Sequence, residues 1–484
     1  MDSEPPGGGA PDSSNLPSLS SEDLPGVVPP SKPLEDAPIV QGGLEATSPQ
    51  PVRDALPPSP GESAFRPVKV VDLDIGIPPA TMTGLERYGF LQALVRRRGT
   101  PLGWVRVPVA NGCCSGPDMA TAVLEQLSGE MVIAKVDEKL ALGLAPDHEP
   151  FDPGSRPSDR LPQATVAVCT RDHPESLGRC LESIERLRYP SMEVVVVDNC
   201  PSSAATESLV RERWPAVRYV RESRPGLDWA RNRALSEARG DVIAYTDDDV
   251  VVDEGWLEAI CGVFAEDDKV SAVTGLVVPV ELETRAQVLF ELYGGFGRGF
   301  KRVWYRADSN SAQHIGAGRF GTGANMAFRR TALETIGGFD PALDVGTITN
   351  GGGDIEIFFR ILQEGHLLVY EPSAIVRHRH RDDYEALRAQ MTNHGVGFFS
   401  YAVRSVLAYP EQRLGFARYT AWWLRKWILR RLMLCLIRPG RYPADLVLAE
   451  LKGGLIGLTR YPRARRQALK LSPARPLADH EQPQ

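Results

Sequence analysis

The stretch that decides the fold is GLDWARNRALSEARGDVIAYTDDDV, residues 226–250. Residues 228–239 predict a helix, and the apolar run 241–245 predicts a buried strand. This strand runs directly into three consecutive aspartates, Asp247, Asp248 and Asp249. A helix followed by a buried strand is the repeating unit of an α/β sheet, so the three acids are expected where such a strand ends.

Three adjacent carboxylates at the end of a buried strand repel one another unless a cation or bound protons compensate them. Hard oxygen ligands suit Mg2+ or Mn2+, which keep some waters and take further oxygens from a phosphate-bearing substrate. Alternate residues of a strand share a face, so Asp247 and Asp249 are expected to hold the metal while Asp248 points elsewhere. The alternative is a solvated acidic turn that caps the next helix.

The alternation of strand and helix continues on both sides of this stretch. The expected strands cover residues 165–170, 193–197, 217–220 and 270–278, and the expected helices cover 174–188 and 256–264. Apolar strands that alternate with helices predict a mostly parallel, twisted sheet covered on both faces. Ligands of such sheets bind beyond the carboxyl ends of the strands, which is where Thr170, Arg171 and Asp198 also fall.

Several segments between residues 165 and 380 resemble the family 2 glycosyltransferases, in the order that this family has them. They are AVCTRDHPESLGRCLESI (167–184), VVVVDN (194–199), the stretch 226–250, GTGANMAFRR (321–330), GGFDPAL (337–343) and GGGDIEIFFRILQEGHLLVYEP (351–372). The resemblance implies the GT-A nucleotide-sugar-binding fold. It also implies sugar transfer from a UDP-, GDP- or dTDP-linked donor to an acceptor hydroxyl, in the inverting mode and in cell-envelope glycan or glycolipid synthesis, with no nucleic acid as partner.

The resemblance also assigns roles on the donor side of the site. It implies that Asp198 contacts the nucleoside, that Thr170 and Arg171 line the same pocket, and that Arg231 lies near the nucleotide. Asp247 and Asp249 would bridge the diphosphate through Mn2+ or Mg2+. A structural role as a turn former or helix cap is the alternative for Asp198.

On the acceptor side, the resemblance implies that Asp354 is the base that takes the proton of the attacking hydroxyl. Gly353 stands where the family commonly has a second acid, so Glu356 is expected to share the base or acceptor-binding role. Asn325 and Asp248 are expected to border the donor and acceptor sugars. The alternative for Asp354 is a plain helix N-cap.

Two histidines follow in Val-Arg-His-Arg-His-Arg, residues 376–381. On an extended strand His378 and His380 share a face, so one imidazole can complete a metal site or contact the diphosphate. We assign His380 to the metal and His378 to the sugar region, although the pattern does not separate the two. A basic rim or a structural histidine is the alternative.

Composition divides the chain into six parts. They are a Pro/Ser/Gly-rich tail expected to be disordered (1–65), a small α/β module (66–145), a linker (146–163), the GT-A catalytic domain (164–390), a basic helical region (391–470) and a second tail (471–484). In the small module we expect a strand at 68–73, a helix at 85–98, a strand at 103–109 and a helix at 118–127.

The C-terminal region is strongly basic, with thirteen Lys and Arg against two acids in residues 418–470. Together with Trp422, Trp423 and Trp427, this indicates an interfacial helix on an anionic membrane. The alternative is a helical hairpin packed on the protein. No apolar run is long enough to span a bilayer, and the N-terminus lacks the pattern of a secretory signal, so a cytoplasmic enzyme, peripheral on the membrane, is expected.

Two other functions compete with this interpretation. A nucleotidyltransferase shares nucleotide-binding α/β architecture and an acid-bound metal, but residues 169–177 lack the glycine-rich phosphate loop expected after its first strand. A catalytically silent binding scaffold is the second alternative, and the presence of Asp247, Asp249 and Asp354 argues against it. The seven cysteines show no CxxC spacing that would indicate a zinc site.

Overall fold

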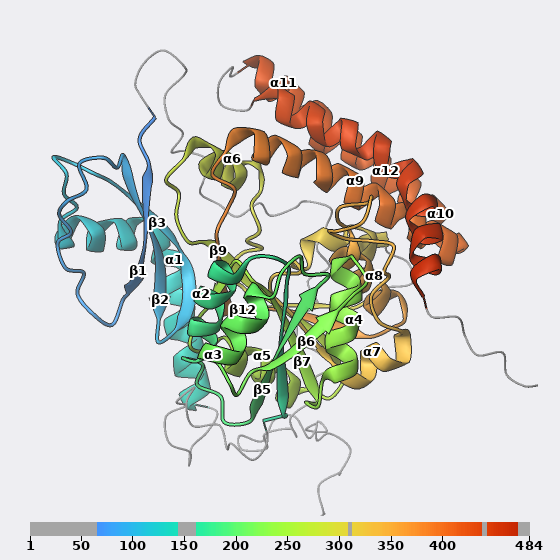
Figure 1. The fold of residues 1–484 in the computed structure, drawn as a ribbon. Coiled ribbons are helices and arrows are strands. Elements are labelled where there is room, and N and C mark those ends of the chain that lie inside the picture. The colour runs from blue at the N-terminus through green and yellow to red at the C-terminus, as the bar shows by residue number, and fades with distance from the viewer. Residues whose placement is uncertain (1–64, 144–160, 308–311, 438–442, 473–484) are drawn as a thin grey trace, which may run out of the picture. The chain divides into compact units, whose positions relative to one another are not determined.

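The computed structural model describes residues 65–143, 161–307, 312–437 and 443–472 (Figure 1). Its largest sheet has nine strands in the order β10-β12-β9-β11-β7-β4-β5-β6, and β8 pairs with β12. The strands are β4 (Ala164–Thr170), β5 (Met192–Asn199), β6 (Arg218–Glu222), β7 (Val242–Asp247), β8 (Val250–Val252), β9 (Val270–Pro279), β10 (Val303–Tyr305), β11 (Met326–Arg329) and β12 (Leu367–His378).

The sheet is parallel where the sequence predicts strands alternating with helices. β7, β4, β5 and β6 run parallel, and β12 runs parallel to β9. β11 lies antiparallel between β7 and β9, and β10 is antiparallel to β12. The result is the mixed α/β architecture of the GT-A fold, in which the parallel strands carry their polar residues to one edge of the sheet.

Helices pack on both faces of this sheet, and β4 shows why. Val166 and Val168 belong to one core, whereas Ala167 and Cys169 belong to the core on the opposite face. Because neighbouring residues of a strand point to opposite faces, a strand that is apolar throughout needs helices on both. The first core includes α2 (Pro174–Ile184) and α5 (Trp256–Glu266); the second includes α4 (Leu227–Glu237) and α8 (Gly353–Gln363).

The remaining helices of this region are shorter or lie outside these two cores. They are α3 (Ala205–Arg213), α6 (Arg285–Tyr293), α7 (Arg330–Ile336) and the single-turn helices Ala312–Ile315, Ala317–Arg319 and Pro410–Gln412. α6 begins with a capping box, in which Thr284 and Gln287 satisfy each other's backbone amides. This cap fixes the start of α6, the helix that carries Glu291.

The residues before the large sheet form a three-stranded sheet and one long helix: β1 (Val68–Asp74), β2 (Phe90–Arg97), β3 (Thr100–Pro108) and α1 (Gly116–Gly143). The prediction of a helix at 85–98 is wrong, because residues 90–97 form the strand β2. Leu91, Ala93 and Val95 pack in the module's own core, whereas Leu94 points the other way, toward Leu276. This period of two suits a strand buried on both faces.

The C-terminal region is helical, as expected: α9 (Tyr384–Ala408), α10 (Arg413–Trp422), a π-helical segment (Trp423–Leu429), α11 (Arg430–Ile437) and α12 (Ala444–Leu471). α12 packs closely on α9, since a Cβ atom added to Gly453 would lie 1.9 Å from the carbonyl oxygen of Thr392. None of the helices in the described ranges has an apolar stretch long enough to cross a bilayer.

Candidate active site

The register of the parallel strands brings the expected donor-side residues to one edge of the sheet. Thr170 pairs with Asp198 on β5, and Cys169 pairs with Asp247 on β7. The ends of β5, β4 and β7 therefore lie side by side, with Asp198 and Asp247 on either side of β4. The polar residues at these three strand ends therefore lie at the same edge of the sheet.

Asp247 and Asp249 are the two acids expected to hold a metal. Burial and the charge of Asp249 raise the pKa of Asp247 to about 7, and the positive charge of Arg231 opposes this shift. Asp249 lies only partly exposed, and its Oδ1 atom is buried without a hydrogen-bond partner. Two neighbouring carboxylates, one with a raised pKa and the other with an unsatisfied buried oxygen, form a site that favours a cation.

Asp248 points away from its two neighbours, toward the loop after β4. Its Oδ2 atom accepts a hydrogen bond of 2.6 Å from the Thr170 hydroxyl and lies 3.4 Å from Nδ1 of His173. The Asp248 carboxylate is thus bound to the donor-side loop, and its expected place beside the sugars stays a prediction. His173 was not expected in the site, and Arg171, about half exposed, stands beside Asp172.

Asp198 is fully buried yet keeps one free acceptor. Tyr219 donates its hydroxyl to Oδ2 of Asp198 at 2.9 Å, whereas Oδ1 is buried with no partner. Burial raises the pKa of this carboxyl. An unsatisfied buried oxygen is costly unless a ligand donates to it, so Asp198 has the property that contact with a nucleoside requires.

Arg231 lies at the centre of the acidic residues. Its Nη1 atom donates to Asp228 at 2.9 Å and to Asp344, and only 4% of its side chain is exposed. Asp247 and Asp354 contribute to the strongly raised pKa of its guanidinium. The buried guanidinium compensates acids from four different segments, and the expected place of Arg231 near the nucleotide stays a prediction.

Asp354 lies in the first turn of α8 and is not its N-cap, which is Gly352 in a left-handed conformation (φ 100°). Its Oδ2 accepts from the backbone amide of Gly323 at 2.9 Å, and its Oδ1 accepts from that of Ile355. Burial and the charge of Asp344 raise the pKa of Asp354. Each oxygen keeps a second lone pair, so the group is held in place and remains able to accept a proton.

Gly353 occupies a position that has no room for a side chain. A Cβ atom added there would lie 2.2 Å from Oδ2 of Asp228, an oxygen that is buried without a partner. The carboxylate of α4 therefore fills the space beside Asp354 that a second acid on α8 would need. Asp228 was missed at the sequence level, although its spacing of three residues from Arg231 on a helix signals an ion pair.

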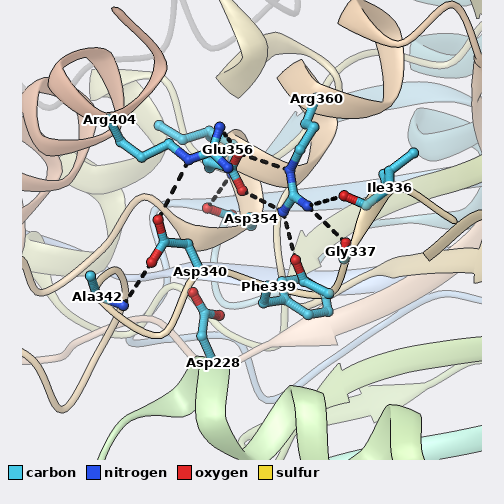
Figure 2. Close-up of polar contacts among 12 residues, drawn as sticks. Asp228, Ile336, Gly337, Phe339, Asp340, Ala342, Asp354, Glu356, Arg360 and Arg404 are labelled. Carbon is cyan, nitrogen blue, oxygen red and sulfur yellow. Dashed lines mark hydrogen bonds and ion pairs between the residues drawn. The ribbon is translucent and has the colours of Figure 1, made fainter. Parts of the chain in front are cut away.

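Glu356 is paired with two arginines in this structure, and its expected share in acceptor binding stays a prediction. Its side chain is fully buried and accepts two hydrogen bonds from Arg360, at 3.0 and 2.8 Å, while Arg404 of α9 stands 2.8 Å away (Figure 2). Arg360 also donates to the backbone oxygens of residues 336–338. Glu356 thus anchors α8 to the C-terminal helices.

Asn325 makes three buried hydrogen bonds that join separate elements. Its Nδ2 donates to the carbonyls of Leu276 on β9 and Ala374 on β12, at 3.0 and 2.8 Å, and its Oδ1 accepts from the Trp256 indole at 2.8 Å. Both amide hydrogens are therefore occupied. The side chain bridges the irregular pairing of β9 and β12, and its expected place beside the sugars stays a prediction.

The structure separates the two histidines. Nε2 of His378 lies 3.6 Å from Oδ1 of Asp249, whereas Nε2 of His380 lies 2.7 Å from Oε1 of Glu291 on α6. Burial is the main reason that the pKa of His378 falls to about 4, so its ring is neutral near pH 7. His378 is thus the imidazole that faces Asp249, and we propose it in place of His380 as the candidate metal ligand.

The residues fit a divalent cation that a bound substrate helps to coordinate. Within the described residues no three His, Cys, Asp or Glu side chains already stand in a metal-coordinating arrangement. Mg2+ and Mn2+ are commonly held by one or two carboxylates together with substrate phosphates and waters, so a complete protein cage is not required. The unpartnered Oδ1 of Asp249, with His378 beside it, is the observation that favours such an ion here.

The sheet order and the polar edge at β5, β4 and β7 define the central region of the chain as a GT-A domain. Residues 162–397 match the model of the glycosyltransferase-like family 2, and this region of the chain belongs to the family 2 glycosyltransferases. The resemblance noted in the sequence is thereby confirmed for the region that carries Asp247 and Asp354.

Similar proteins occur in bacteria, archaea and animals. The pre-mycofactocin glycosyltransferase of Mycobacterium tuberculosis is 27% identical over 311 residues, 63% of this chain and 59% of that protein. The glucosyl-dolichyl phosphate glucuronosyltransferase of Haloferax volcanii is 24% identical over 233 residues, 45% of this chain and 69% of that protein. The succinoglycan biosynthesis protein ExoM of Rhizobium meliloti is 27% identical over 220 residues, 44% of this chain and 65% of that protein. The chain thus matches about three fifths of the length of the mycobacterial relative.

A solved structure with a similar fold is the mannosyltransferase PcManGT from Pyrobaculum calidifontis in complex with GDP-Man and Mn2+. It is 22% identical to this chain, with a TM-score of 0.42, and the alignment covers 64% of this chain and 89% of that one. A likeness at this level tells nothing about the ligands that this chain binds.

Proposed function

We propose that this protein transfers a sugar from a nucleoside-diphosphate donor to an acceptor hydroxyl, with inversion and with a divalent cation. The observation that carries the proposal is the position of Arg231, whose charge acts on the pKa of both Asp247 and Asp354. A carboxylate suited to a cation and a carboxylate suited to proton transfer are thus gathered around one buried guanidinium. Membership in the glycosyltransferase-like family 2 supports the same reaction class.

On the donor side, the free Oδ1 of Asp198 accepts a hydrogen bond from the nucleoside, and Thr170 and His173 hold Asp248 in the adjoining loop. Asp247, Asp249 and His378 are the groups that would hold Mn2+ or Mg2+. A cation bound there supplies Lewis-acid stabilisation of the negative charge that develops on the leaving diphosphate.

On the acceptor side, Asp354 takes the proton of the attacking hydroxyl. A general base works best when its pKa is close to the working pH, and burial together with Asp344 raises the pKa of Asp354 in that direction. The amides of Gly323 and Ile355 fix the orientation of the carboxylate. A single base facing the sugar from the side opposite the leaving group gives inversion.

We further propose that the acceptor is a glycan, a glycolipid or a polyhydroxylated small molecule of the cell envelope. The printed names of relatives, a glucosyl-dolichyl phosphate glucuronosyltransferase and a succinoglycan biosynthesis protein, support this class. The donor is a UDP-, GDP- or dTDP-linked sugar.

The C-terminal helices support a peripheral contact with an anionic membrane. Large apolar side chains of α10, α11 and the segment between them are exposed: Leu414, Leu424, Leu429, Met433, Leu436 and Ile437. Exposed bases lie among them, namely Arg418, Arg425, Lys426 and Arg430. Apolar side chains interleaved with bases match a lipid surface that carries negative headgroups. The opposite side of these helices packs on the protein, with Trp423 and Ile428 in a core shared with α6 and α9.

The reaction is tested by screening UDP-, GDP- and dTDP-sugars for thermal stabilisation with Mn2+, followed by measuring donor hydrolysis or transfer. Asp354→Asn is expected to keep donor binding and to lose at least about a hundredfold in turnover, the usual contribution of a general base. Asp247→Ala is expected to lose both donor binding and turnover.

Asp268→Ala, which removes a fully exposed carboxylate, is the matched control and should behave like the parent. If no nucleotide sugar stabilises the protein, or if Asp354→Asn turns over at the parent's rate, the proposed function is wrong.

A further inference from the structure

A chain of four side chains from three segments leads from α6 to the acids after β7. Oε1 of Glu291 lies 2.7 Å from Nε2 of His380, Nδ1 of His380 lies 3.2 Å from Nδ1 of His378, and Nε2 of His378 lies 3.6 Å from Oδ1 of Asp249. The first two contacts are hydrogen bonds, whereas the third is too long to be one.

The direction of these hydrogen bonds is set by Glu291. An ionised carboxylate only accepts, so Nε2 of His380 carries the hydrogen that it donates to Glu291. When each ring carries one hydrogen, Nδ1 of His380 is the acceptor and Nδ1 of His378 is the donor of the contact between them. A neutral His378 with its hydrogen on Nδ1 keeps a lone pair on Nε2.

That lone pair faces another electron-rich atom. Oδ1 of Asp249 is buried and has no hydrogen-bond partner, and Nε2 of His378 stands 3.6 Å from it with no hydrogen to offer. Two acceptors that face each other in a buried place repel unless something positive lies between them. An imidazole nitrogen and a carboxylate oxygen are both ligands of Mn2+ and related ions.

An aromatic side chain packs against each of the two imidazole rings. Phe290 packs edge-on against His380, with ring centres 4.7 Å apart, and Phe296 packs edge-on against His378 at 5.1 Å. The Glu291 carboxylate packs closely against Gly295 (φ 49°), where an added Cβ atom would lie 2.7 Å from its Oε1.

We propose that Glu291 is a positioning residue for the cation site: through His380 it selects the tautomer of His378 whose Nε2 lone pair, with Asp249, binds the divalent cation. This proposal rests on the proposed function and deepens it. His380 and Glu291 do not touch the ion. They act as the outer hydrogen-bond partners that orient a metal-binding imidazole, a role whose removal typically weakens metal affinity ten- to a hundredfold.

Binding of Mn2+ alone, with free Mn2+ followed by electron paramagnetic resonance, is the direct test. Glu291→Leu is expected to weaken Mn2+ binding at least about tenfold. Glu291→Gln, whose amide oxygen can still accept from His380, is expected to lose less. Asp249→Asn should weaken binding at least as much as Glu291→Leu, and Glu334→Leu, at a half-exposed position on α7, should have no effect.

The failures of the two proposals are distinguishable. If Asp249→Asn weakens Mn2+ binding and Glu291→Leu leaves it unchanged, the role of Glu291 is refuted while the cation site stands. If neither Asp249→Asn nor Asp247→Asn changes Mn2+ binding, the proposed metal dependence itself falls.

A second measurement tests the proposal even if the Glu291→Leu variant does not fold. Nitrogen-15 spectra of the metal-free parent report which ring nitrogen carries hydrogen, and a His378→Gln variant assigns the signals. The expected result is a hydrogen on Nδ1 of His378 and on Nε2 of His380. A hydrogen on Nε2 of His378 would overturn the proposal.

Discussion

Asp354 and Glu356 stand two residues apart on α8, yet their surroundings assign them opposite tasks. Asp354 is oriented by two backbone amides and keeps lone pairs free, whereas Glu356 is fully enclosed between Arg360 and Arg404. Their identity as acids is visible in the sequence. Their difference is not, because the residue that neutralises Glu356 from α9 is 48 positions away.

The raised pKa of Asp247 predicts how stability depends on pH at the residue scale. A carboxyl with a pKa of about 7 in the folded state and about 4 in the unfolded state binds more protons when folded. The free energy of unfolding of the metal-free protein therefore falls as pH rises from about 4 to 7. The contribution of Asp247 to this slope is at most about 1.4 kcal/mol per pH unit.

Chemical denaturation of the metal-free parent and of Asp247→Asn, measured at several pH values, checks this prediction. The variant is expected to show a flatter dependence between pH 4 and 7 and to be the more stable of the two at pH 7 and above. Parallel curves for the two proteins would mean that Asp247 ionises normally.

At the element scale, glycines allow the backbones of α9 and α12 to pack closely. The sequence alone shows only a basic, apolar segment here. A Cβ atom on Gly395 would lie 2.1 Å from the carbonyl of Glu450, and one on Gly453 would lie 1.9 Å from that of Thr392. The sequence-level choice between a membrane helix and a packed hairpin is therefore not exclusive, since α12 packs on α9 while other helices expose apolar and basic side chains.

Gly453→Ala is expected to destabilise the protein by about 1–3 kcal/mol, because the added methyl group forces two closely packed backbones apart. Gly129→Ala in α1 is the matched control. It also replaces a helical glycine, but nothing lies within 4 Å of the added Cβ, so it should be neutral or stabilising by up to about 1 kcal/mol. Equal effects of the two substitutions in thermal or denaturant unfolding would contradict the close packing of α9 and α12.

Prediction from sequence also failed at this scale in the N-terminal module, for a clear reason. Residues 85–98 have a composition that a helix tolerates, but Leu94 packs against Leu276 of the large sheet while Leu91 and Val95 pack in the module's own core. A segment buried on two opposite faces has no polar stripe to reveal its period. Its strand conformation depends on partners that lie far away in the chain.

At the scale of the whole molecule, the acidic and the basic residues lie in different parts of the structure. The acids of the middle region surround Arg231, whereas the exposed bases of the C-terminal region lie among exposed leucines on α10 and α11. The exposed part of α10 and α11 is the surface that we propose for anionic lipid, and α9, which precedes these helices, is joined to the catalytic domain by the ion pair of Arg404 with Glu356 of α8.

Sedimentation with vesicles tests the membrane surface. The full chain is expected to bind vesicles containing anionic lipid and to bind neutral vesicles much less. Replacing Arg425 and Lys426 by alanine should weaken the partition about tenfold or more, since each base near an anionic surface contributes about 1 kcal/mol. Replacing the exposed Arg186 and Arg188 by alanine is the matched control; equal loss in both pairs, or no binding at all, would refute a specific surface on α10 and α11.

The sequence by itself determined the alternation of strands and helices in the GT-A domain and the placement of Asp198 and Asp247 to Asp249 at strand ends. These features depend on local periodicity and on apolar runs, which neighbouring residues specify. Only the tertiary structure decided which of these side chains keep free atoms. The amide hydrogens of Asn325 are donated to carbonyls of β9 and β12. His378 faces Asp249, whereas His380 faces Glu291. Asp228 fills the space beside Gly353. The reason is physical: the availability of a polar atom depends on its partners, and these partners come from segments far apart in the chain, as Glu291 and His380 do.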